Sequence, residues 1–261
     1  MIDYSFSIEE LEYFLIVVVR CAGFISIVPF FHMGNTPRRF RVALSISLGY
    51  LVYHASLPHE VLSYSTVFEY AVIIMKEAVT GILIGMGASV CNSIVLFAGR
   101  MADMEIGLSM VNAMDPTTKE QATITGFYYQ YMVILILIVS DLYQFIILAL
   151  GESFQLIPVN GAVIDKDKML TAFIRFMGEY INIGFRICLP VFCAILIVNV
   201  VLGILAKIAP QMNMFAIGIQ IKMLVGLSVM FLTVRMLPYV ADFVYTEMKT
   251  IMVSFVEAMI P

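Results

Sequence analysis

The chain has 261 residues, of which 61% are hydrophobic and only 13% charged, and its net charge is −4 at pH 7. A soluble domain is roughly 45–50% apolar and about 25% charged, so this composition excludes an ordinary water-soluble protein and requires lipid or protein neighbours over most of the surface. No run of basic residues indicates nucleic-acid binding.

Cysteine and histidine give no sign of a metal or cofactor site, and we expect neither. The cysteines form no Cys-x-x-Cys pair and lie in apolar stretches, so we interpret them as small buried hydrophobes: Cys21, Cys91, Cys188 and Cys193. The histidines lie in or beside the first two short connections without ligand spacing: His32, His54 and His59. The N-terminal residues are acidic, which is not typical of a secretory signal.

Six apolar segments approach or exceed the length that a helix needs to cross the ~30 Å hydrocarbon core of a bilayer. Barrel strands are much shorter and alternate in polarity, so the expected fold class is all-α, a polytopic helical membrane protein. The segments cover about residues 13–31, 42–57, 70–97, 127–150, 187–206 and 223–239. The tail from residue 240 is amphipathic, with these apolar residues on one helical face: Val244, Met248, Ile251, Met252, Phe255 and Met259.

Five charged residues lie inside or near the ends of these segments: Arg20, Lys76, Glu77, Asp141 and Arg235. A charge at the centre of a membrane helix costs about 2.5–3.5 kcal/mol on insertion scales. They could form an ion or proton pathway, or they could be paired and buried against other subunits. We favour burial, because a proton relay has several acids within reach and Asp141 has no acidic neighbour in its segment.

A polar stripe precedes the fifth segment. Arg175, Glu179, Asn182 and Arg186 recur at spacings of four, three and four, which predicts one shared helical face, and Asn199 follows inside the segment. The stripe is either a solvated face or a surface facing a partner helix or a water-filled lumen. In the third segment, Gly81-x-x-x-Gly85 makes a thin face that favours close helix packing.

The third connection, about residues 100–125, is rich in methionine and low in charge. Asp115-Pro116 breaks a helix, and Gly107 lies within a cluster of flexible methionines. These properties suit either ordinary core filling or a loop that closes a pore and yields to a passing chain.

Two motifs resemble the FliR family of flagellar export proteins. Gly107-Leu108-Ser109-Met110 followed by Asp115-Pro116 is similar to the family's GLSF…DP loop. Residues 199–218, NVVLGILAKIAPQMNMFAIG, are similar to its NLALGLL…APQLNIF…G signature. The signature positions are Gly203, Ala209, Pro210, Gln211, Asn213, Phe215 and Gly218. Met110 replaces a common phenylalanine, and Ile219-Gln220 replaces a frequent Phe-Pro.

The resemblance implies a core subunit of the flagellar type III export gate in the bacterial inner membrane, at the flagellar basal body, and not an enzyme. One FliR would join five FliP and four FliQ subunits, with FlhB and FlhA associated, around a channel for unfolded flagellar subunits. A FliP-like part, about residues 1–185, would be fused to a FliQ-like hairpin and tail, about residues 186–261. Many apolar segments would then pack on other subunits and not span lipid.

The resemblance also assigns residues. The channel would be plugged in its closed state by the loop from Glu105 to Ala122, which includes Gly107, Leu108, Ser109, Met110, Val111, Asn112, Met114, Asp115 and Pro116. The polar residues singled out above by their place in or beside apolar segments would then be buried or face partner subunits: Arg20, Lys76, Glu77, Asp141, Arg175, Glu179, Arg186 and Asn199. Three alternatives stay open: the equivalent SctT/SpaR subunit of a virulence injectisome, a solute or ion transporter, and an intramembrane enzyme.

Overall fold

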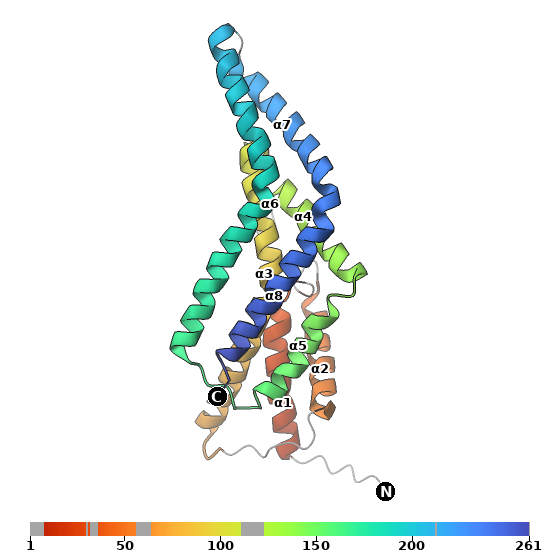
Figure 1. Ribbon diagram of the computed structural model, residues 1–261. Helices are drawn as coiled ribbons and strands as arrows, with labels where there is room; N and C mark the ends of the chain where they lie inside the picture. The colour runs from red at the N-terminus through yellow and green to blue at the C-terminus, as the bar shows by residue number, and fades with distance from the viewer. Residues whose placement is uncertain are drawn as a thin grey trace. The chain divides into compact units, whose positions relative to one another are not determined.

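The computed structural model describes the chain apart from residues 1–7, 30, 32–35, 56–63, 111–122, 212 and 261. The described part contains helices and no strands, which confirms the all-α class (Figure 1). In chain order the elements are α1 (Ile8–Ile27), α2 (Arg38–Ala55), α3 (Val67–Ile106), η1 (Leu108–Met110), α4 (Ile124–Val139), α5 (Gln144–Leu156), α6 (Lys166–Ile208), α7 (Met214–Thr233), η2 (Val234–Met236) and α8 (Leu237–Glu257).

The chain forms two compact units, each assembled from segments that are distant in sequence. The first unit comprises Met1–Val90, Asp141–Phe176 and Thr246–Pro261, and the second comprises Cys91–Ser140 and Met177–Tyr245. The long helices α3, α6 and α8 therefore contribute to both units. The division near residue 185 into FliP-like and FliQ-like parts stays a prediction.

Close packing of α1 against α3 organises the first unit and confirms the role of the small residues in the third segment. A Cβ atom on Gly81 would lie 2.1 Å from the carbonyl oxygen of Arg20, and one on Gly85 would lie 2.8 Å from that of Phe24. Only glycine permits this approach. One face of α1 is consequently buried, including Phe24 and Cys21.

Three predicted boundaries were wrong. The fourth segment is two helices, because Ser140 to Tyr143 form a turn in which Asp141 has a φ of 56°. Aspartate tolerates this left-handed conformation better than most residues. The third segment was predicted to end near residue 97, but α3 runs on to Ile106. The fifth segment was predicted to begin near residue 187, but α6 begins at Lys166. These two errors have one cause. Both extensions carry several charged residues, which lower the hydropathy of a sequence window but do not break a helix.

By length and composition, three helical stretches in the described part of the chain could cross a membrane, fewer than the six apolar segments. They are Val67–Val90, Lys166–Ile208 and Phe215–Glu257. The number rises to four if α4 and α5 together form one broken span. Helices α1 and α2 do not qualify. Of the cysteines, Cys21 and Cys188 are buried as expected, whereas Cys193 is exposed.

Candidate functional site

Two of the embedded charges predicted from the sequence form one buried ion pair in the first unit. Arg20 on α1 and Glu77 on α3 are fully buried, and Nε of Arg20 donates to Oε2 of Glu77. These residues are 57 positions apart in the sequence. Their own chain encloses them, so burying this pair requires no neighbouring subunit.

The remaining N–H donors of Arg20 form hydrogen bonds with backbone carbonyl oxygens at the C-terminal end of α5. Nη1 donates to the carbonyl oxygens of Ile157, at 2.8 Å, and Ser153, at 3.4 Å, while Nη2 donates to that of Pro158 at 3.4 Å. The guanidinium carbon also lies 4.2 Å from the ring centre of Phe154. Carbonyls at a helix C-terminus lack partners within the helix and carry partial negative charge. Arg20 therefore acts as a cap for α5 supplied by a different helix.

The turn after α5 is held by α3. The backbone N–H of Asn160 donates to Oε1 of Glu77 at 2.8 Å, and Nζ of Lys76 donates to the carbonyl oxygen of Asn160 at 2.7 Å. Asn160 has a φ of 65°, a left-handed conformation that asparagine adopts readily. Sequence reasoning missed Asn160. The Asn160-Gly161 dipeptide signals a turn, but the partners of Asn160 lie 83 and 84 positions away in the sequence.

The other predicted polar residues are not gathered at this network. Asp141, Arg175, Arg186, Asn199 and Arg235 are exposed, and Glu179 is half-buried. Arg175 and Glu179, four positions apart on α6, form no ion pair in the described part of the chain. The guanidinium of Arg186 lies 5.8 Å from the ring centre of Phe243 on α8. The exposed residues are available to solvent or to a partner.

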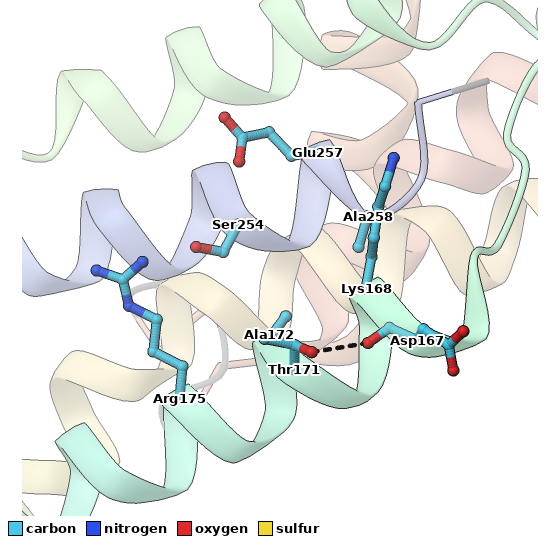
Figure 2. Close-up of a pocket in the computed structure, with 8 residues that line it drawn as sticks. All are labelled: Asp167, Lys168, Thr171, Ala172, Arg175, Ser254, Glu257 and Ala258. Carbon is cyan, nitrogen blue, oxygen red and sulfur yellow. Dashed lines mark hydrogen bonds between the residues drawn. The ribbon is translucent and has the colours of Figure 1, made fainter.

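A groove of the first unit, with charged side chains in its lining, lies between the start of α6 and the end of α8 (Figure 2). Its volume is about 390 Å³, and Lys168, Arg175 and Glu257 contribute charges of both signs. Figure 2 shows the hydroxyl of Thr171 donating to the carbonyl oxygen of Asp167, at 2.9 Å. The mixed charges do not select one class of ligand, so the groove does not define the function.

The first residues of the predicted plug loop are anchored in the core of the second unit. Gly107 ends α3 with a φ of 92° and donates its N–H to the carbonyl oxygen of Asp103 at 3.0 Å, a glycine helix cap. Leu108 is buried and Ser109 half-buried. The core around Leu108 comprises Ala102, Ile106, Cys188, Val191, Ile195 and Met230. The backbone of Met110 ends η1, whereas Val111, Asn112, Met114, Asp115 and Pro116 lie outside the described residues.

The signature stretch forms the junction between α6 and α7. Oδ1 of Asn213 accepts the N–H of Ala216 at 3.4 Å and so caps the start of α7. Gly218 is buried, and a Cβ atom there would lie 3.4 Å from Leu202 on α6. The other signature residues are exposed, apart from half-buried Ala209: Gly203, Pro210, Gln211 and Phe215.

Comparison with known proteins identifies the chain's relatives. The model of the family described as bacterial export proteins, family 1, matches residues 11–248. The flagellar biosynthetic protein FliR of Bacillus subtilis is 28% identical over 231 residues, covering 85% of this chain and 88% of the relative. FliR of Aquifex aeolicus is 26% identical, covering 87% and 88%. FliR of Escherichia coli is 22% identical, covering 87% and 84%.

The buried network predicts a specific pattern of stability. Arg20→Met or Glu77→Leu alone should lower the free energy of unfolding by about 3–5 kcal/mol, because each leaves an unpaired buried charge. The double variant Arg20→Met, Glu77→Leu leaves no unpaired charge. Its free energy of unfolding should therefore be higher than that of Glu77→Leu alone and closer to that of the wild type. Thermal unfolding in detergent measures all three. Losses that simply add in the double variant would contradict direct pairing.

Proposed function

The chain belongs to the bacterial export proteins, family 1, and from that premise we propose that it is a core subunit of the flagellar type III protein export gate. The resemblance to the FliR family predicted from the two motifs is confirmed. The observation that carries the proposal is that the family match covers residues 11–248 and so includes both motifs.

The proposed partners are FliP and FliQ homologues, five and four to one copy of this chain, with FlhB and FlhA. Supporting this, α6 and α7 expose large apolar side chains within the second unit: Leu196, Ile197, Val200, Val201, Ile204, Ile208, Phe215, Leu224, Leu227, Phe231 and Leu232. Such a surface needs lipid or protein to cover it. In this proposal other gate subunits cover much of it, and the assembly belongs to the bacterial inner membrane.

The proposed role of the connection after α3 is to close the resting channel. Supporting this, Gly107 and Leu108 fix its start in a packed core, so the following residues begin from a defined position. Methionine at positions 110 and 114 supplies flexible apolar bulk. The substrates would be unfolded flagellar subunits, and the chain itself would perform no chemical catalysis.

Three alternatives have less support. An injectisome subunit is disfavoured because the three relatives compared above are flagellar biosynthetic proteins. A transporter was motivated by the embedded charges, but Arg20 and Glu77 are committed to each other and to backbone groups of the chain. An intramembrane enzyme needs converging catalytic groups, but Asp141 lies exposed in a turn and Glu77 is bonded to Arg20 and to the backbone of Asn160.

Assembly with partner subunits should depend on the exposed apolar surface of α7. Phe231 is 77% exposed, and burying a phenylalanine stabilises contact by about 1.5–3 kcal/mol. Phe231→Gln should therefore reduce co-purification of FliP and FliQ homologues in mild detergent by roughly tenfold or more. Phe231→Leu, which keeps an apolar group, should not. Equal recovery of the partners with both variants would show that this face does not contact them.

Channel closure is tested by shortening the connection. Deleting Val111 to Met114 keeps Gly107 and the buried Leu108, so the core is retained. We expect the assembled gate to conduct small ions, because the apolar bulk is removed. Membrane conductance in vesicles that contain the purified complex measures this. An assembled deletion gate with the ion permeability of the wild type would reject the closure role.

A further inference from the structure

A groove of the first unit lies between α2 and α5, which run beside each other in Figure 1. Its volume is about 610 Å³, which is in the range of natural binding clefts, roughly 300–1,000 Å³. The wall on α2 is a row of apolar side chains at the spacing i, i+3, i+4 and i+7 of a single helical face: Leu48, Leu51, Val52 and Ala55.

Both walls of the groove are fixed by the core of the first unit. A Cβ atom on Gly49 of α2 would lie 2.7 Å from a methyl group of Val18, so α2 packs tightly against α1. On α5, Leu150 and Phe154 line the groove and are buried. The guanidinium carbon of Arg20 lies 4.2 Å from the ring centre of Phe154. The chain alone therefore forms the groove, which lowers the entropy cost of binding a partner.

Two consecutive residues of α5 leave space and a charge on the second wall. A Cβ atom on Gly151 would have no neighbouring atom within 4 Å, so there is room here for a side chain of another molecule. Glu152 is exposed, and no hydrogen bond or ion pair joins its carboxylate to another described residue. Among the described residues that line the groove, Glu152 is the one that carries a charge. Large apolar side chains are exposed on both walls, Leu51 at 62% and Leu148 at 61%.

The carboxylate of Glu152 discriminates between the molecules that could cover these apolar walls. A lipid acyl chain would remove water from Glu152 without neutralising it, and an unpaired charge in apolar surroundings is costly. An amphipathic helix matches the i, i+3, i+4 and i+7 row on α2, which is the spacing used when a helix binds in a groove. A lysine or arginine on that helix would neutralise the carboxylate. The groove therefore fits a helix with a basic residue better than it fits lipid.

We propose that the groove between α2 and α5 receives a helix of a neighbouring gate subunit, whose apolar side chains lie between Leu51 and Leu148 and whose lysine or arginine pairs with Glu152. That the neighbour is a gate subunit rests on the proposed function above. The groove belongs to the first unit, whereas the exposed apolar side chains of α6 and α7 named above belong to the second. This contact is therefore additional to the one tested with Phe231.

Blocking the groove tests the contact in the purified gate complex. Gly151→Leu fills the open space, and Gly151→Ala, which adds only a methyl group, is the matched control. Glu152→Gln keeps the side-chain size, removes the charge, and decides alone if Gly151→Leu does not fold. We expect Gly151→Leu and Glu152→Gln to lower co-purification of a FliP or FliQ homologue on the order of tenfold, and Gly151→Ala to have a much smaller effect. Wild-type recovery of both homologues with either variant would overturn the proposal.

Photo-crosslinking identifies the occupant and separates this proposal from the proposed function. A benzophenone amino acid replaces exposed Leu148, the membranes are illuminated, and the crosslinked peptide is identified by mass spectrometry. A peptide of a gate subunit with a lysine or arginine within one helical turn of the crosslink supports the groove contact. A crosslink to lipid or to a second copy of this chain, or no crosslink, would overturn it. If the wild-type chain retains no FliP or FliQ homologue, the proposed function fails, and a crosslink to a basic helix of another identified membrane protein still supports the groove.

Discussion

Arg20 must be neutralised where it lies, because an unpaired charge in the interior of an apolar chain costs several kcal/mol. The carboxylate of Glu77, the carbonyls at the end of α5 and the ring of Phe154 together meet this requirement. The need to neutralise Arg20 brings together α1, α3 and the end of α5 in the first unit. Gly81 lets the α3 backbone contact α1 at the level of Arg20. The backbone N–H of Asn160 donates to the second carboxylate oxygen of Glu77.

The second unit uses the same physical solution for a different purpose. Asp103 is also a buried charge whose partners come from a distant part of the chain. In the second unit, the carboxylate of Asp103 links the end of α3 to the start of α4. In the first unit, Arg20 and Glu77 link α1, α3 and the end of α5. Whereas these buried polar groups have partners within the chain, the large apolar side chains of α6 and α7 are exposed. A chain whose buried charges are hydrogen-bonded internally, but whose apolar surface is exposed, is suited to a larger membrane assembly in which other subunits or lipid cover that surface.

The sequence was sufficient for the fold class and for most helices, because long apolar runs and the absence of alternation determine both. Arg20 and Glu77 were also identified individually, since charges in apolar runs are conspicuous. Their pairing could not be predicted across 57 positions. The turn at Asp141 escaped because apolar residues flank it on both sides. Asp103 was missed because the polar end of α3 resembled a loop, and only the fold brings Thr123 to it.

Secretion measured in living cells tests the central claim most directly. The gene for this chain is removed, and hook and filament subunits are quantified in the culture medium and inside the cells. A gate subunit predicts that these subunits are made but no longer secreted, and that the wild-type gene restores secretion. Normal secretion of flagellar subunits by cells without the chain would contradict the account.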